Sequence, residues 1–300
     1  MGAMDVESLR MFVKVAELAS FTRAAEHLGR SKARVSTAVR ALEEDVGTRL
    51  LQRSTRAVRL TTDGEEFLGR ARQLVGHCDE LAAMFQAPTT LRGRARVDMP
   101  QSLARSLFIP RLAELFAAHP HIEVQLSATD RRVDVVREGF DCVLRVGKLD
   151  ESSLTARRLG EMRMMNCASP SYLRRYGTPR ALADLDGHLI VHYSARFGAD
   201  APSFEYQDGN VYRERPMRCA ITVNSSDSYN AACIAGLGII QAPRSGMLPA
   251  IASGDLVEIL PQHTCEPLPV SLVHPHGRNV PRHVRVVMSW IAELLKPQLA

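Results

Sequence analysis

The sequence predicts an α/β protein that begins with an all-α-dominated winged helix-turn-helix, continues through a long linker helix and ends in a larger α/β body. Three observations predict this arrangement. Three short helical patterns occupy the first 43 residues, an apolar seam at helical spacing runs over residues 62–85, and strand and helix patterns alternate from residue 92 onward. A chain of 300 residues is long enough for two or more domains with ordinary cores.

Positive charge is concentrated at the N-terminus. Residues 1–60 hold eleven Lys and Arg against seven Asp and Glu, a net charge of +4, whereas the other 240 residues carry only +1. A small basic module on a nearly neutral body is typical of nucleic-acid binding, because neutralising phosphates needs clustered cations. The chain has no signal-peptide pattern and no run near the roughly 20 apolar residues of a membrane helix. We therefore expect a soluble, cytoplasmic protein without a membrane partner.

The first 43 residues predict three helices. In the segment from Asp5 to Ser20, Asp5 is a suitable N-cap, and apolar residues recur at three- and four-residue spacing on one face. Two shorter helices follow over 22–28 and 31–43, and Gly29 between them suits the tight turn after a helix end. Three helices with a short turn between the last two predict a helix-turn-helix.

The third predicted helix has a short, polar and basic outer face. Val35, Val39 and Leu42 can point to the core, which leaves the intervening side chains for the major groove of double-stranded DNA. On an isolated helix these side chains would simply be solvated, but the preceding turn and the basic segment that follows favour DNA contact. After Gly47, two short apolar runs can pair as a hairpin, which predicts a wing along the phosphates. In this domain, expected over 1–61, the predicted DNA contacts are Thr22, Arg23, Ser31, Lys32, Arg34, Ser36, Thr37, Arg40, Arg53, Ser54 and Arg56.

Residues 62–91 are predicted to form a linker helix and a hinge. From Thr62 to about Phe85, apolar residues repeat at alternating four- and three-residue steps, and the segment 88–92 breaks the helix. A seam this wide needs a partner helix, so the sequence predicts a homodimer or homotetramer. Packing of the seam on the chain's own body is the alternative. The seam residues are Phe67, Ala71, Leu74, Cys78, Leu81 and Phe85.

The body, from residue 92, shows the rhythm of βαβ units, which implies a mostly parallel sheet. The predicted strands are 94–100, 121–128, 141–147 and 219–224. The predicted helices are 103–118, 133–138, 226–235 and a closing helix from Pro281, at its first position, to about Leu295.

Three segments resemble the LysR-type transcriptional regulators. The first is SFTRAAEHLGRSKARVSTAVRALEEDVGTRLLQRSTRAVRLTTDG at 20–64, and the others are REGFDCVLRVG at 137–147 and VNSSDSYNAACIAGLGIIQAP at 223–243. The first segment departs from the family in its reading helix. There Lys32-Ala33 and Thr37-Ala38 stand where many relatives carry Gln-Pro and Arg-Gln pairs. The operator sequence is therefore expected to differ from the common pattern of the family.

The resemblance implies a sequence-specific regulator of transcription with an effector-binding domain at 92–300. That domain would consist of two α/β lobes like those of a periplasmic binding protein. Lobe I would comprise about 92–162 and 268–300, and lobe II about 163–267. A small effector would bind in the crevice between them, which is also where open α/β sheets bind ligands. RNA polymerase is a further candidate partner, and no catalysed reaction is expected.

Five residues are candidates for effector binding. Ser102 opens a helix, so its hydroxyl and the helix N-terminal amides suit an anion or a carbonyl, although an ordinary N-cap serine looks the same. Thr129 follows a strand, and Asn224 and Ser225 occupy a strand-to-helix corner. Arg145 ends an apolar strand, where an unpaired guanidinium is costly, so it should face a partner carboxylate or an effector. We expect a small anion or a polar carbonyl-containing metabolite.

Other classes of function lack support in the sequence. The six cysteines form no C-x-x-C pair, which favours reduced thiols, and a redox sensor built on a cysteine pair is the alternative. His119, His121, His274 and His276 have no partners at ligand spacing, so neither a metal nor a cofactor is expected. No G-x-S-x-G, H-E-x-x-H or P-loop pattern occurs. The remaining rival is an enzyme or transport-type binding protein with an incidental basic N-terminus.

Overall fold

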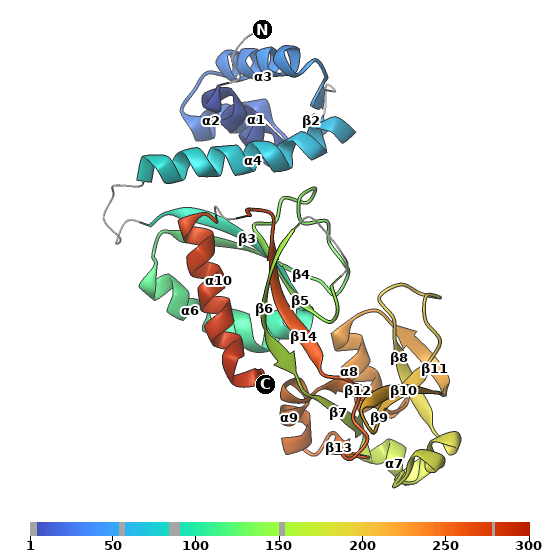
Figure 1. The fold of residues 1–300 in the computed structure, drawn as a ribbon. Helices are drawn as coiled ribbons and strands as arrows, with labels where there is room; N and C mark the ends of the chain where they lie inside the picture. The colour runs from blue at the N-terminus through green and yellow to red at the C-terminus, as the bar shows by residue number, and fades with distance from the viewer. Residues whose placement is uncertain (1–4, 54–57, 84–90, 150–153, 278–279) are drawn as a thin grey trace.

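The structure is a computed structural model that describes residues 5–53, 58–83, 91–149, 154–277 and 280–300. The chain forms an N-terminal helical module, a central lobe I and a lobe II at the far end (Figure 1). Helix α4 lies between the other helices of the module and lobe I (Figure 1).

The N-terminal module contains the three predicted helices and a short hairpin. Its elements are α1 (Val6–Leu18), α2 (Phe21–Leu28), α3 (Lys32–Val46), β1 (Leu51–Arg53) and β2 (Val58–Leu60), followed by α4 (Thr62–Ala83). Each of the first three helices begins at a side-chain cap: Asp5 accepts from Ser8 N, Ser20 from Arg23 N and Ser31 from Arg34 N. The caps therefore start α2 one residue earlier than predicted, and α3 continues to Val46 before Gly47 ends it with φ 78°.

The core of the module is built from all of its helices. Phe12, Val35 and Val39 are fully buried, as the helical periodicity predicted for the two valines. Phe67 of α4 packs edge-on against Phe12, with ring centroids 5.5 Å apart. The first turn of α4 packs directly against the backbone before β1, because a Cβ at Gly64 would clash with the carbonyl oxygen of Leu50. Helix α4 is thus part of the module's core as well as a linker.

Lobe I is a sheet covered by helices. Its described strands are β3 (Gly93–Met99), β4 (Ile122–Ala128), β5 (Cys142–Val146), β6 (Thr155–Met162) and β14 (Leu268–His274), in the order β4-β3-β5-β14-β6. Strand β3 is parallel to β4 and β5, but β14 is antiparallel to β5 and β6. Strands β3, β4, β5 and β6 therefore run in one direction, as expected for a mostly parallel sheet, and β14, which returns from lobe II, is the one reversed strand among the five described.

The helices of lobe I follow the prediction with two exceptions. One continuous helical run comprises α5 (Gln101–Leu103), a π-helical segment (Ala104–Phe108) and α6 (Ile109–Ala118), and α10 (Arg282–Leu295) closes the lobe. Pro281 is the N-cap of α10 and not its first residue. The predicted helix at 133–138 is a single turn, in which Glu138 N donates to Asp134 O. Gly139 ends this turn in the left-handed conformation, with φ 68°. A six-residue apolar pattern does not distinguish a helix from a single turn.

Lobe II is built on smaller sheets of two or three strands. Its described strands are β7 (Met164–Ala168), β8 (Leu189–Tyr193), β9 (Ser203–Asp208), β10 (Val211–Pro216), β11 (Arg218–Val223), β12 (Ile240–Pro243) and β13 (Val257–Glu258). Strand β7 pairs antiparallel with β12 and β13, β8 runs parallel to β11, and β9 and β10 form a hairpin. The helices are α7 (Pro170–Tyr176), α8 (Ser226–Ile234) and α9 (Arg244–Ala252), with 3-10 turns at Leu182–Gly187 and, back in lobe I, Lys296–Gln298.

Candidate nucleic-acid interface and ligand cleft

The outer face of α3 is open to solvent. Lys32, Arg34, Thr37 and Arg40 are exposed and Ser36 is partly exposed, on the side opposite the buried valines. At the start of α2, Thr22 and Arg23 are also exposed. Ser31 caps α3, so its hydroxyl already accepts a hydrogen bond from Arg34 N at 3.2 Å. The predicted DNA contacts that fall on α2 and α3, with the cap Ser31, are thus all exposed or partly exposed.

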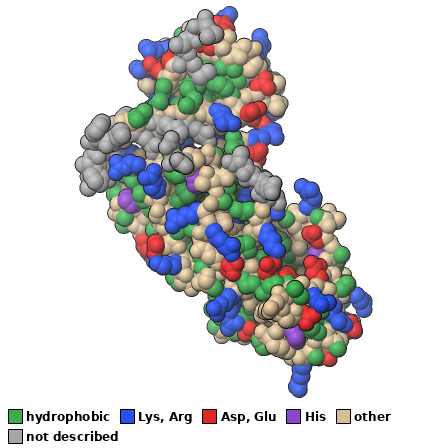
Figure 2. Space-filling model, in the orientation of Figure 1, with side chains coloured by type: hydrophobic (Ala, Val, Ile, Leu, Met, Phe, Trp, Pro, Cys, Tyr) green, Lys and Arg blue, Asp and Glu red, His purple; other side chains and the backbone are tan. Residues whose placement is uncertain are grey.

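Two of the exposed arginines near this face share an acidic partner. Nη2 of Arg30 and Nη2 of Arg34 each lie 3.3 Å from Oε1 of Glu7. Exposed ion pairs contribute at most about 1 kcal/mol and exchange readily, so phosphates can replace Glu7. Of the predicted wing residues, Ser54 and Arg56 lie outside the described residues, and Arg53 ends β1, paired in register with Val58. On the visible face of the body, Lys, Arg, Asp and Glu are interspersed (Figure 2).

The apolar seam of α4 divides into two parts. Ala71 is 1% exposed and Phe67 contacts the buried core of the N-terminal module. Further along, Leu74 is 49% exposed and Leu81 is 66% exposed, whereas Phe85 lies outside the described residues. Cys78 is half-buried between them in sequence. The first part therefore packs on the chain's own module, and the second part offers apolar surface that no described residue covers.

The N-terminal module touches lobe I through a partly buried carboxylate. Glu17 of α1 lies 2.9 Å from Lys14, 3.6 Å from Arg72 of α4 and 3.4 Å from Arg94 of β3. Burial opposes ionisation of Glu17, but the hydrogen bond and the charge of Lys14, together with the two arginines, outweigh it and lower the pKa of Glu17. Strand β3 runs from this contact to Met99, next to the cleft described below. No sequence signal pointed to this contact.

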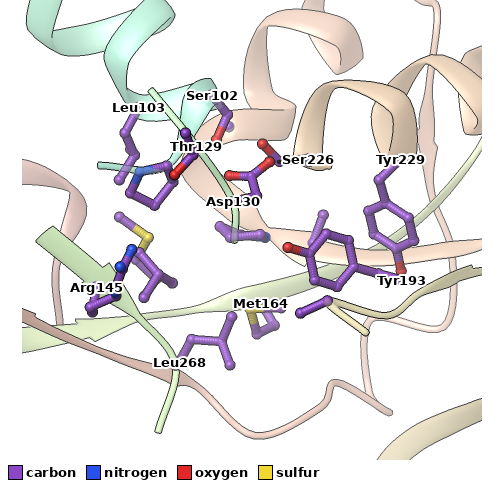
Figure 3. Close-up of a pocket in the computed structure, with 18 of the residues that line it drawn as sticks. Ser102, Leu103, Thr129, Asp130, Arg145, Met164, Tyr193, Ser226, Tyr229 and Leu268 are labelled. Atoms are coloured by element: carbon purple, nitrogen blue, oxygen red, sulfur yellow. Dashed lines mark hydrogen bonds between the residues drawn. The ribbon is translucent and has the colours of Figure 1, made fainter. Parts of the chain in front are cut away.

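A cavity of about 1110 Å³ lies between the two lobes. Ser102, Thr129 and Arg145 line it from lobe I, and Tyr193 and Tyr229 line it from lobe II (Figure 3). This volume lies just above the roughly 300–1,000 Å³ that is typical of small-molecule sites, so the cavity has room for a small ligand. Three of the five predicted effector residues therefore meet at one cavity.

The other two predicted effector residues, Asn224 and Ser225, do not line the cavity, although the residue that follows them in sequence does. Asn224 is exposed, and neither it nor Ser225 is among the lining residues. Ser225 is the N-cap of α8 and accepts a hydrogen bond from Ser228 N at 3.2 Å. The next residue, Ser226, lines the cavity instead (Figure 3). Ser225 is therefore an ordinary N-cap serine. Because α8 begins at Ser226, it is Ser226 that lies at the cavity.

Arg145 has a partner carboxylate in the wall of the cavity. Its Nη1 donates to Oδ2 of Asp98 at 3.1 Å, and the hydroxyl of Thr129 donates to Oδ1 of Asp98 at 3.0 Å. Asp98 is 0% exposed, and burial raises its pKa, although Ser127, Thr129 and Arg145 act in the opposite direction. Nη2 of Arg145 is also buried and has no hydrogen-bond partner among the described residues. Arg145 is thus a structural counter-ion whose Nη2 retains its N–H donors for a ligand.

Four of the five cysteines of the body are poor candidates for peroxide sensing, the exception being the half-buried Cys219. Cys142, Cys167, Cys233 and Cys265 are buried and not in disulfides. Burial raises the pKa of Cys167 and Cys265 to about 12, and those of the other two further. Since the thiolate is the reactive form, these thiols are not activated.

Within the part of the chain that the structure describes, no group of three or more His, Cys, Asp or Glu is placed to hold a metal ion. Among the described helices, none combines the length and the apolar composition that crossing a bilayer requires.

The geometry defines a class of protein. A helix-turn-helix with an exposed basic outer helix, joined to two lobes around a ligand-sized cavity, is a ligand-responsive DNA-binding regulator of transcription. Two family models match the chain: the bacterial regulatory helix-turn-helix protein, lysR family, over residues 6–65, and the LysR substrate binding domain over residues 88–296. The chain belongs to the LysR family of transcriptional regulators.

Individual relatives agree with this assignment. The chain is 43% identical to the HTH-type transcriptional regulator YhjC of Escherichia coli K12 over 295 residues, covering 98% of this chain and 99% of that protein. It is 30% identical over 294 residues, 96% of each chain, to the HTH-type transcriptional regulator CrgA of Neisseria meningitidis serogroup B. A solved structure of CrgA matches with a TM-score of 0.62 at 29% identity, covering 96% of this chain and 98% of that one. ArgP from Mycobacterium tuberculosis, at 21% identity and a TM-score of 0.66, covers 97% of each chain and supports the fold.

The family assignment carries the general function. This protein is a sequence-specific DNA-binding regulator whose DNA binding is modulated by a small molecule held by its two-lobed domain, and regulators of this family form oligomers.

Proposed function

We propose that the exposed faces of α2 and α3, with the wing after β1, contact double-stranded DNA, and that a homodimer or homotetramer presents paired modules to two half-sites. The observation that carries the proposal is the solvent-open basic face of α3 opposite a buried apolar stripe. A face of this kind suits the major groove, and half-site spacing follows from the symmetry of the oligomer. The exposed seam of α4 around Leu74 and Leu81 supports pairing of linker helices.

The interlobe cavity is proposed as the effector site, within a domain of residues 92–300 that follows the module (1–61) and linker (62–91). Ser102, Thr129 and Arg145 from lobe I, with Ser226 and Tyr193 from lobe II, would contact the effector. A change in lobe placement would reach the DNA-binding module through β3 and the Glu17 contact. Acting on chromosomal DNA places the protein in the cytoplasm, and RNA polymerase is the proposed partner once the oligomer is bound. A regulator of this kind needs no catalysed reaction.

Footprinting on the DNA upstream of the protein's own gene and its neighbours tests the proposal. A protected region with two half-sites is expected, with protection that changes when the effector is added. Absence of any protected sequence, with random DNA bound equally well, would reject the function.

Replacing Arg34 with alanine tests the reading face directly. Losing an arginine that reads a base should weaken binding to the specific site by about 1–3 kcal/mol while affecting random DNA less. Fluorescence anisotropy with both DNAs at fixed salt measures the difference. Arg174, an exposed arginine on α7 of lobe II, provides the matched control, and Arg174→Ala should bind as the wild type does. Equal affinity of the Arg34→Ala and wild-type proteins for the specific site would remove α3 as the reading helix.

A further inference from the structure

One carboxylate in the cavity wall joins helix N-termini from opposite lobes. Oδ1 of Asp130 accepts from Gln101 N at 3.2 Å, and Oδ2 accepts from Ser226 N at 2.5 Å. Gln101 begins the helical run 101–118 of lobe I, and Ser226 begins α8 of lobe II. The first N–H groups of a helix have no partner within it and favour negative charge. Asp130 therefore fills, with the protein's own charge, the position that an anion in this cleft would take.

A second link crosses between the lobes beside the first. Nη2 of Arg105, on the helical run of lobe I, lies 3.0 Å from Oδ1 of Asp227, in the first turn of α8. Together with Asp130, this pair ties the start of α8 to lobe I. The arrangement belongs to the cleft itself, since Arg105, Asp130 and Ser226 all line the cavity.

Other cations around the cavity also have acidic partners. Arg131 lies 2.6 Å from Glu138, Lys148 lies 2.7 Å from Glu266, and Arg145 holds the buried Asp98. The negative charge of Asp130 is felt inside the cleft as well. Burial, together with this charge, raises the pKa of Tyr193 to about 12. Including Arg105, four of the five cations that line the cavity are therefore paired with acidic groups of the chain.

The rest of the lining suits an uncharged molecule. Leu103, Met164 and Leu268 present apolar surface, and the rings of Tyr193 and Tyr229 lie on the side of lobe II (Figure 3). The two rings pack edge-on, with centroids 5.7 Å apart. Asp130 lies between the lobe I residues and these rings in Figure 3, where it can accept a hydrogen bond from a ligand.

We propose that Asp130 is a built-in anion that links the two lobes and excludes carboxylate ligands, so that the effector is a neutral molecule with an apolar body and a hydrogen-bond donor for Asp130. This proposal rests on the proposed function, because it takes the cleft as the effector site. Of the two effector classes expected from the sequence, a small anion or a polar carbonyl-containing metabolite, it excludes the anion, since that expectation left out Asp130 and the partners of the cavity cations.

Chemical rescue with formate tests the proposal. Asp130→Ala should lower the melting temperature of the full-length protein and open an anion site at the two helix N-termini. Formate, titrated against chloride at constant ionic strength, should then raise the melting temperature of this variant saturably and recover at least half of the loss. The wild-type protein, whose site is filled, should show no saturable response, and neutral formamide should rescue neither protein.

Two variants serve as controls. Asp130→Asn keeps the volume of the side chain and so leaves no room for formate, which should leave it without rescue. Asp134 also accepts a backbone N–H in lobe I, from Arg137 at 3.0 Å, but does not line the cavity. Asp134→Ala should therefore show no formate response.

Two results would overturn the proposal about Asp130. Saturable stabilisation of the wild-type protein by formate would overturn the proposal, because the anion position would be open. An Asp130→Ala protein that formate does not restabilise, or that fails to fold equally with and without formate, would also overturn it. Operator binding by the wild-type protein reports the proposed function separately. If DNA binding is retained while formate rescue fails, the inference about Asp130 falls and the function stands.

Discussion

Replacing Arg145 with alanine is expected to lower the free energy of unfolding by about 3–5 kcal/mol, because the change leaves a buried carboxylate without its counter-ion. Asp98 is 0% exposed, and its one cationic contact in the described residues is Nη1 of Arg145 at 3.1 Å. Urea denaturation of the full-length protein at neutral pH measures the loss. Since the hydroxyl of Thr129 remains hydrogen-bonded to Asp98, the carboxylate keeps a donor but no charge partner.

The destabilisation should depend on pH in a defined direction. Burial raises the folded-state pKa of Asp98 even with Arg145 present, and loss of the cation should raise that pKa further. A raised pKa means that the folded state binds the proton more tightly than the unfolded state, so stability falls as the pH rises through the folded pKa. The difference between wild type and variant should therefore be small in acid. It should grow between the two folded-state pKa values of Asp98 and stay constant above them.

A paired variant separates the charge from the packing. Asp98→Asn combined with Arg145→Met removes both charges at similar volume, and replacing a whole buried pair is often neutral or stabilising. The double variant should therefore be much more stable than Arg145→Ala alone. If Arg145→Ala unfolds at the same urea concentration as the wild type at every pH, Asp98 does not depend on this pair. Arg145 would then be free to act on a ligand alone.

Replacing Leu74 with glutamate is expected to yield monomers or readily dissociating dimers with poor operator affinity. Leu74 is 49% exposed and Leu81 is 66% exposed on α4, so a large part of each side chain is open to a partner helix. A charge in an apolar helix pair must be desolvated, and a single module reaches only one half-site. Light scattering gives the oligomeric state, and a gel shift on the operator gives the affinity.

Arg174 provides the control for this prediction. It is exposed on α7 of lobe II, away from the seam, so Arg174→Glu introduces the same side chain without entering the pair of α4 helices. The Arg174→Glu protein should keep its oligomeric state. An intact oligomer in the Leu74→Glu protein would show that the subunits associate through another surface.

Most of the N-terminal module could be predicted from local patterns. Its helices begin at capping side chains and end at glycines or after short apolar repeats, which are interactions between residues three or four apart. The family-specific run at 20–64 added the order of the elements. The predicted helix at 133–138 was wrong, because a six-residue apolar pattern does not distinguish a helix from one turn that supports a strand.

The candidate sites divide in the same way. Ser102, Thr129 and Arg145 stand beside strand ends, so their approach to one cavity followed from the topology expected for the two lobes. Asp98 and Asp130 were not predicted, because a single aspartate beside a strand has no distinguishing neighbour in the sequence. Their roles depend on Arg145, Gln101 and Ser226, which lie far away along the chain.

The sequence by itself determined the helix-turn-helix, the basic face of α3 and the family, because periodicity, capping and net charge are local or additive properties of the chain. The tertiary structure alone decided the direction of β14, the burial of the first part of the α4 seam and the pairing of the cleft charges. Each of these depends on which distant groups meet when the chain folds. The free energy of a buried charge or an apolar face is set by that partner and not by its neighbours in sequence.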